Sequence, residues 1–339
     1  MAVLSAGVLS ANESLEVLTA LRRSALYTER QHSYLLYPVK TLARFTDKNQ
    51  LDASQIPAPL LAQLTQAGPD AVLDRDEQGC IYFSGHLTKA ADVDNVLDKL
   101  TAEGLQITQS DRQHVQQLFI DTFRHDLFTG RSGGMYAYEG IGSIYWHMVS
   151  KLLLAVSEVV VAAAKAGASE ETLSGLKAMY EDVRKGIGFN KSPEVYGAFP
   201  TDPYSHTPAS GGARQPGMTG QVKEEVLTRL AEVGLRVEAG HIVFDPVLLR
   251  KQEMLDETTS LHYVDISGQQ QTVSVDAGQL AFTFCQVPVA LQQGDGTRIT
   301  VQFSDGREEV LLSDRLPQSL SESIFMKRGE IAALQVALP

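Results

Sequence analysis

The sequence predicts an α+β protein in which a mainly helical body is followed by a small antiparallel β-sandwich. Two observations support this class. Up to about residue 250, apolar residues recur at helical spacing. Beyond that point the pattern changes to alternation with period two, broken by short glycine-containing turns. We therefore expect a helical domain over residues 1–250, carrying the functional site, and a β-sandwich domain over residues 255–339.

The composition is that of an acidic chain with a formal net charge of -12 over 339 residues, of which 43% are hydrophobic. Nucleic acids and anionic membranes both bind basic surfaces, so this charge argues against either partner. The N-terminus lacks the basic and apolar regions of a signal peptide. The longest apolar stretch, residues 152–164, is short for a membrane span and contains Glu158. We expect a cytoplasmic protein with two buried thiols, Cys80 and Cys285.

The helical body contains about seven predicted helices. Ser10 or Asn12 caps the first, which runs to Leu26, and Ser110 with Gln113 forms a capping box for a later one. The others span residues 57–66, 92–102, 144–167, 169–186 and 219–230, and a hairpin over residues 71–83 interrupts the series. The helix over residues 144–167 is apolar on nearly all sides, so we expect it to be buried.

The β region consists of short alternating segments. Predicted strands span residues 262–267, 271–275, 279–291, 298–303, 308–312 and 332–338. The turn sequences SGQQ, DAG, GDG and SDG separate most of them. Short strands at regular spacing are typical of a β-sandwich.

A polar stripe along the central helix is the first candidate site. Glu139, Ser143, His147 and Lys151 recur every four residues among apolar neighbours, so they would share one helix face. Buried charged groups must be paired or line a wet cavity. The stripe therefore either faces a ligand site or forms an internal network that ties the helix to the following loop.

The proline-rich loop over residues 188–219 is the second candidate site. Its aromatic residues argue against disorder, and long ordered loops often carry function. Sugar rings stack their C–H faces on aromatic rings, while their hydroxyls bond to planar polar groups. A general acid for glycosidic cleavage would be a carboxylic acid, and Glu139 and Asp202 are the candidates. The alternative is an ordered structural loop packed on the helices.

Other motifs are weak. The GRSGG run at residues 130–134 matches a nucleophile elbow, but that motif requires a preceding strand and a helix is predicted there. The sequence contains no dinucleotide-binding or P-loop motif and no convincing metal-ligand spacing. We therefore expect no metal and no cofactor.

Two runs carry a resemblance to known proteins. They are TGRSGGMYAYEGIGSIYWHMVSKLLLAVSE and GIGFNKSPEVYGAFPTDPYSHTPASGGARQPGMTGQVKEE. Both resemble the carboxy-terminal part of large bacterial proteins that are similar to six-hairpin glycosidases and inverting sugar phosphorylases. The resemblance implies an (α/α) toroid, a β-sandwich and carbohydrate chemistry. About seven helices are too few for six hairpins, so we expect an incomplete toroid, a fragment, or a subunit completed by a partner.

These features together predict a carbohydrate-active enzyme, a glycoside hydrolase or phosphorylase, that uses Glu139 or Asp202 for acid–base catalysis. The alternative is a non-catalytic sugar-binding or assembly subunit of a larger complex. The expected partners are a carbohydrate, inorganic phosphate, and further copies or other chains that complete the helical domain. The substrate-binding candidates are Tyr138, Trp146, His147, Lys151, Lys191, Tyr196, Tyr204, His206, Arg214 and Gln215.

Overall fold

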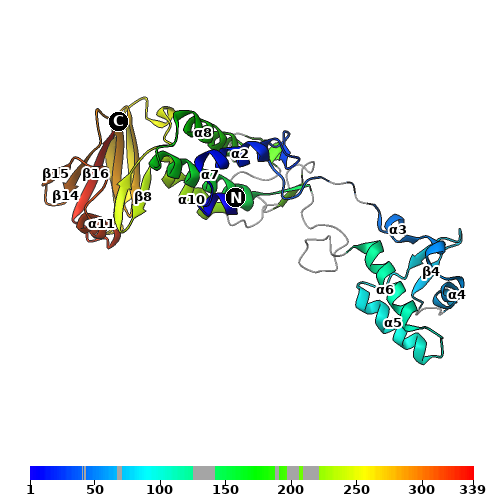
Figure 1. Ribbon diagram of the computed structural model, residues 1–339. Coiled ribbons are helices and arrows are strands. Elements are labelled where there is room, and N and C mark those ends of the chain that lie inside the picture. The colour runs from blue at the N-terminus through cyan, green and yellow to red at the C-terminus, as the bar shows by residue number, and fades with distance from the viewer. Residues whose placement is uncertain are drawn as a thin grey trace. The chain divides into compact units, whose positions relative to one another are not determined.

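Figure 1 shows the computed structural model of the protein, which describes residues 1–39, 41, 43–66, 71–124, 142–187, 191–196, 206–208 and 221–339. The chain folds into two units. Unit 1 combines Met1–Leu35 with Ile144–Pro339, and unit 2 is the continuous segment Leu36–Ser143. Unit 2 therefore interrupts the sequence of unit 1. The domain boundary predicted near residue 255 lies within unit 1 and stays a prediction.

The helical part of unit 1 is built around α7 (Trp146–Lys165). This helix buries most of its circumference, including Leu152, Val156 and Val160, as its apolar sequence requires. Its neighbours are α1 (Ala2–Ser5), α2 (Ala11–Arg22), α8 (Glu170–Lys185) and α10 (Gln221–Glu232) (Figure 1). The short helix α9 (Pro193–Tyr196) lies between α8 and α10 in the sequence.

Capping side chains set the start of these helices. Ser10 accepts a hydrogen bond from the backbone N–H of Glu13, whose carboxylate accepts one from the Ser10 N–H in return. Ser169 caps α8 in the same position. The Ser10 cap confirms the sequence prediction, although α2 ends at Arg22 and so falls short of the expected end at Leu26.

Of the described helices, α7 is long and apolar enough to cross a membrane by length and composition. Within its most apolar window, 56% is buried inside the protein. A core helix passes the same test, and the packing of α7 against its neighbours accounts for its apolar sequence.

A five-stranded sheet forms the other part of unit 1, with strand order β12-β13-β16-β14-β15. The strands are β12 (Gln279–Phe284), β13 (Val287–Gln293), β14 (Arg298–Phe303), β15 (Glu308–Leu311) and β16 (Ile331–Leu338). β13 and β16 run parallel, and the other neighbours are antiparallel. The prediction of a wholly antiparallel region is therefore wrong, because the chain returns through α11 (Gln318–Phe325) to the middle of the sheet.

The hydrophobic core of this part lies between the sheet, α11 and a β-hairpin (Figure 1). The hairpin consists of β8 (Leu235–Glu238) and β9 (His241–Phe244), joined by a two-residue turn in which both residues have positive φ angles. The core includes Leu291, Ile299 and Val336 from the sheet, Phe244 from β9 and Ile324 from α11. The strands of the C-terminal β region thus begin before residue 250, earlier than the sequence pattern indicated.

A second hairpin, β10 (Thr259–Val264) with β11 (Gln270–Val275), precedes the sheet in the sequence. The predicted DAG turn joins β11 to β12, and Gly278 in this turn has a φ of 79° that favours glycine. One sheet flanked by a helix and hairpins does not confirm the predicted sandwich.

Unit 2 has a hydrophobic core of its own, centred on residues such as Leu97 and Phe119. Its sheet has the order β3-β5-β4, with β3 (Gln50–Leu51), β4 (Leu73–Arg75) and β5 (Ile81–Phe83). Its helices are α3 (Phe45–Lys48), α4 (Ala58–Gln66), α5 (Ala90–Ala102) and α6 (Gln109–Phe123). The predicted hairpin over residues 71–83 is confirmed by the antiparallel pair β4–β5.

The capping box of α6 differs from the predicted one. Thr108, not Ser110, is the N-cap, and it exchanges hydrogen bonds with Asp111 rather than pairing with Gln113. The carboxylate of Asp111 is a stronger acceptor than the carboxamide expected in its place, so the helix begins earlier.

Two backbone hydrogen bonds join the first residues of unit 2 to its last residues. The backbone N–H of Leu36 donates to the carbonyl of Ser143 at 2.8 Å, and that of Gly142 donates to the carbonyl of Tyr37 at 3.2 Å. The two ends of the segment are therefore adjacent in space. β6 (Ser143–Tyr145) continues from this point and pairs with β7 (His206–Pro208).

The described structure is a mixed α+β fold, as predicted. It does not confirm a toroid of helical hairpins. The helices of unit 1 surround a single central helix, and several helices counted toward the toroid belong to unit 2.

Candidate functional site

The predicted polar stripe does not lie on one helix. Ser143 belongs to strand β6, and α7 begins only at Trp146. His147 is half-buried in the first turn of α7, and Lys151 is exposed one turn later. Glu139 lies outside the described residues. The prediction is wrong at Ser143 because a short apolar run cannot be assigned to strand or helix from its periodicity alone.

Two predicted aromatic residues meet in the structure. The ring centroids of Trp146 and Tyr196 lie 4.0 Å apart, with an angle of 32° between the ring planes. Both side chains are 0% exposed, in a cluster with Leu35, Ile144 and Val149. Their predicted role as sugar platforms needs an exposed ring face, and neither ring presents one in this structure.

Lys191 places a cation beside this aromatic pair. Its ammonium nitrogen lies 5.8 Å from the ring centroid of Trp146 and 6.0 Å from that of Tyr196, within cation–π range. It donates hydrogen bonds to the backbone carbonyl of Gly186, at 2.7 Å, and to that of Gln31. Burial lowers the pKa of this ammonium to about 8. Within the described part of the chain, no carboxylate forms an ion pair with it.

The hairpin that carries Gln31 brings further polar groups to the same region. It consists of β1 (Tyr27–Thr28) and β2 (Ser33–Tyr34). In its turn, His32 adopts a φ of 46°, which is uncommon for a residue with a side chain. Its ring nitrogens lie 3.0 Å from the Tyr27 hydroxyl and 3.1 Å from the Asp182 carboxylate.

Arg22 completes this second group. Its Nε donates to the Asp182 carboxylate at 2.9 Å, and its guanidinium carbon lies 3.4 Å from the centre of the Tyr27 ring. Burial raises the pKa of Tyr27, so the phenol remains protonated at neutral pH and is not a ready nucleophile. The sequence interpretation missed this group, because its members lie far apart in the sequence.

Gly186 allows the hairpin and α8 to approach each other closely. A Cβ atom at this position would lie 2.2 Å from the carbonyl oxygen of His32. Only glycine fits there without movement of the backbone. The same residue supplies the carbonyl that holds Lys191, so one close contact positions both polar groups.

A second buried charge, Glu232 on α10, is surrounded by donors. Its carboxylate accepts hydrogen bonds from the Tyr180 hydroxyl at 2.6 Å, Arg184 Nε at 2.5 Å and a terminal nitrogen of Arg229 at 2.7 Å. Burial alone would raise the pKa of Glu232, but these hydrogen bonds outweigh burial, and the pKa is lowered. Arg229 also pairs with Glu253 at 2.5 Å, which extends the network beyond α8 and α10.

The other predicted site residues cannot be placed. The candidate acids Glu139 and Asp202 lie outside the described residues, as do Tyr138, Tyr204, Arg214 and Gln215. The backbone of His206 is described in β7, without its side chain. The structure therefore brings together Trp146, Tyr196 and Lys191 from the predicted set.

The described part of the chain contains no set of metal ligands. No group of three or more His, Cys, Asp or Glu side chains there could hold a metal ion. Cys80 and Cys285 are both free thiols and are half-buried, not fully buried as predicted.

Residues 42–126 match the family described as GH149 phosphorylase insertion domain 2. The match covers about a quarter of the chain and falls within unit 2, Leu36–Ser143. The chain thus resembles GH149-like phosphorylases through an insertion domain, which bears out the resemblance to sugar phosphorylases. A comparison with curated proteins finds no match.

Proposed function

We propose that this chain is part of a glycoside phosphorylase, which transfers a glycosyl group from a glycan to inorganic phosphate. The observation that carries this proposal is the match of residues 42–126 to a phosphorylase insertion domain. Unit 2, which contains the matched segment, has its own core, and its two ends are hydrogen-bonded to each other. These are the properties expected of a domain inserted into a host, and unit 1 would be that host.

Phosphorolysis makes defined demands on the site. The glycosidic C–O bond breaks while a carboxylic acid protonates the leaving oxygen, and a phosphate oxygen forms the new bond to the sugar carbon. Phosphate is itself the nucleophile, so one carboxylic acid and one or more cations suffice. An inverting hydrolase needs a second carboxylate to activate water. We assign the acid to Glu139 or Asp202 and a phosphate contact to Lys191, whose charge no described carboxylate neutralises.

The reaction can be tested in both directions. The protein is incubated with a panel of neutral oligosaccharides with and without inorganic phosphate, and sugar 1-phosphate is measured. In the reverse direction, sugar 1-phosphates and oligosaccharide acceptors should release phosphate. Phosphate-independent release of reducing sugar would assign a hydrolase instead.

Variants of the two candidate acids sharpen the test. Glu139→Gln and Asp202→Asn keep the side-chain shape and remove the acid. The true acid should lose about 10²–10⁴-fold in turnover. Glu194→Gln, on the exposed face of α9, is the matched control and should keep its activity.

A non-catalytic sugar-binding or assembly subunit is the second candidate. It is favoured by the confinement of the match to an insertion domain. Oligosaccharide binding without turnover in either direction would support it, and light scattering would show whether further copies assemble. We also propose a cytoplasmic location, because the two free thiols suit a reducing compartment.

A further inference from the structure

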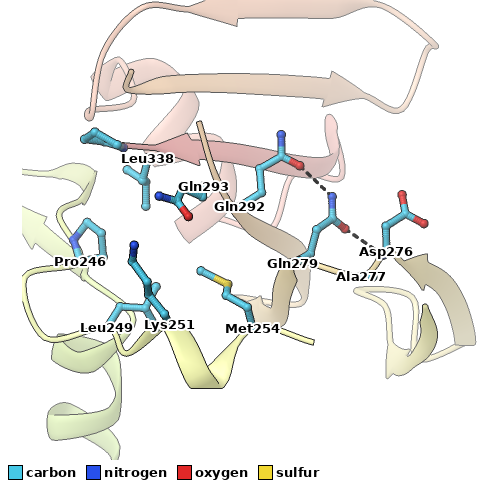
Figure 2. A pocket seen from close by; sticks show the side chains of 12 residues that line it. Pro246, Leu249, Lys251, Met254, Asp276, Ala277, Gln279, Gln292, Gln293 and Leu338 are labelled. Atoms are coloured by element: carbon cyan, nitrogen blue, oxygen red, sulfur yellow. Dashed lines mark hydrogen bonds between the residues drawn. The ribbon is translucent and has the colours of Figure 1, made fainter. Parts of the chain in front are cut away.

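A cavity lined by described residues lies in unit 1, between the sheet and the segment that leads into it. Its volume is about 700 Å³, within the range of small-molecule sites. Figure 2 shows Pro246, Leu249 and Met254 facing the ends of β12, β13 and β16 across this space. Leu338 on β16 completes an apolar floor.

Carboxamides dominate the polar part of the cavity. Gln279 accepts a hydrogen bond from the backbone N–H of Asp276 at 3.1 Å and donates one to Gln292 at 3.0 Å (Figure 2). This arrangement fixes the Gln292 oxygen and leaves its amino group without a partner among the described residues. The carboxamide of Gln293 likewise has no described partner. The cavity therefore offers donors and an acceptor on planar groups.

The charges of the cavity balance. Lys251 supplies one positive group and Asp276 one negative group, and both are exposed. Neither forms a side-chain ion pair within the described structure. A strongly anionic ligand would gain little from a site that carries both signs. A neutral ligand with many hydroxyls can bond to both charged groups and to the carboxamides.

From this lining we infer that the cavity binds a neutral oligosaccharide, with its hydroxyls on Gln292 and Gln293 and its C–H face on the apolar floor. The choice of a sugar among neutral polar ligands rests on the proposed function, whereas the character of the cavity does not. None of the twelve described lining residues is aromatic, so ring stacking is absent and the affinity should be of millimolar order.

Saturation-transfer NMR on the full chain tests this inference. The probes are cellohexaose, maltohexaose, laminarihexaose, mannohexaose and xylohexaose, in phosphate-free buffer, with oligogalacturonate as the charged comparison. At least one neutral hexasaccharide should bind, and oligogalacturonate should bind more weakly. Binding by none of the five, or preference for the charged oligomer, would overturn the inference.

Variants localise the binding. Gln292→Leu with Gln293→Leu removes the free carboxamides and should weaken binding at least about tenfold, because two hydrogen bonds are lost. Ala277→Trp, on the exposed turn, should fill the cavity and do the same without touching the carboxamides. Gln335→Leu, exposed on β16 outside the cavity, is the matched control. Binding that survives both cavity variants would contradict the inference.

The phosphorolysis assay and the oligosaccharide-binding assay can fail independently of each other. Binding in phosphate-free buffer does not depend on turnover, so an absence of phosphorolysis would leave this test standing. Phosphorolysis by a protein that binds no oligosaccharide in this cavity would remove the site and keep the proposed function.

Discussion

Unit 1 buries two charges in different ways, one at Glu232 and one at Lys191. Glu232 receives hydrogen bonds from two guanidinium groups and a phenol, so its charge is neutralised where it lies. Lys191 is held by two carbonyl groups and two aromatic rings, none of which carries a negative charge. The pKa of each group is lowered, which stabilises the charged form of Glu232 and the neutral form of Lys191.

This contrast distinguishes Glu232, whose charge stabilises the fold, from Lys191, whose charge is available to bind a ligand. A buried carboxylate that is fully paired cannot protonate a leaving group at neutral pH, because its acid form is too scarce. A buried ammonium without a counter-charge gains when an anion arrives. We therefore expect the Glu232 network to act in folding and Lys191 to act in binding.

The largest effect is expected from Glu232→Gln. This change leaves Arg184 and Arg229 without their shared carboxylate, and breaking a buried ion pair costs about 3–5 kcal/mol. Urea denaturation measures the free energy of unfolding. Glu257→Gln, in an exposed loop, is the control and should stay within about 0.5 kcal/mol of the wild type. Equal stability of the two variants would mean that the network is not structural.

The contribution of the Glu232 network to the free energy of unfolding should also depend on pH. The pKa of Glu232 is lower in the folded state than in the unfolded chain, so its stabilising effect is present above the unfolded value. That effect is lost as the pH falls through the folded value. Wild type should therefore lose stability in acid faster than Glu232→Gln, and the gap between their unfolding free energies should narrow.

Gly186→Ala should give the next largest effect. The added Cβ atom would meet the His32 carbonyl at 2.2 Å, and such overpacking costs about 1–3 kcal/mol. The backbone shift would also move a carbonyl that holds Lys191. Gly296→Ala is a fair control, since no atom lies within 4 Å of the new Cβ there. Similar melting temperatures for both variants would show that the β1–β2 hairpin can move to accommodate the added Cβ atom.

Lys191→Met should have a smaller effect that depends on pH. The folded pKa of about 8 lies below that of an ordinary lysine, so the unfolded chain binds more protons between these values. Wild type should therefore gain stability relative to the variant as the pH rises from about 8 toward about 10. Lys151→Met, which removes an exposed ammonium, is the matched control for the loss of one positive charge. A constant difference would contradict the burial of the Lys191 charge.

Removal of unit 2 is the largest change to the chain, and we expect it to have the smallest effect on the structure of unit 1. Both buried charges are built from residues of unit 1 alone. Joining Tyr37 to Gly142 through an Asn-Gly turn should keep the emission of Trp146, the only tryptophan, which lies beside Lys191. A red shift of this emission would show that unit 2 is needed to close the cluster around Lys191.

Local signals in the sequence predicted many elements correctly. Ser10 and Ser169 each begin a helix because their hydroxyls bond to backbone groups within the next turn, which needs no distant partner. The hairpin of β4 and β5 and the buried central helix follow from patterns of equally short range. The resemblance to sugar phosphorylases likewise rested on residues quoted from the sequence.

Distant relations could not be predicted in the same way. Arg22 and Asp182 lie 160 residues apart in the sequence, and no spacing rule connects them. Helical periodicity is the same inside unit 2 as outside it, so the insertion left no mark in the pattern. The polar stripe was predicted wrongly at Ser143, because a stripe on one helix requires the helix to begin before Ser143, and it begins at Trp146.

The central position of β16 also governs the order in which the sheet can form during synthesis. β13 and β14 are synthesised before β16, yet both pair with β16 and not with each other. Until β16 has been made, each of these apolar strands presents an unpaired edge, which is a template for wrong pairing. The sheet therefore cannot fold as the chain emerges, and its closure waits for long-range contacts that form slowly.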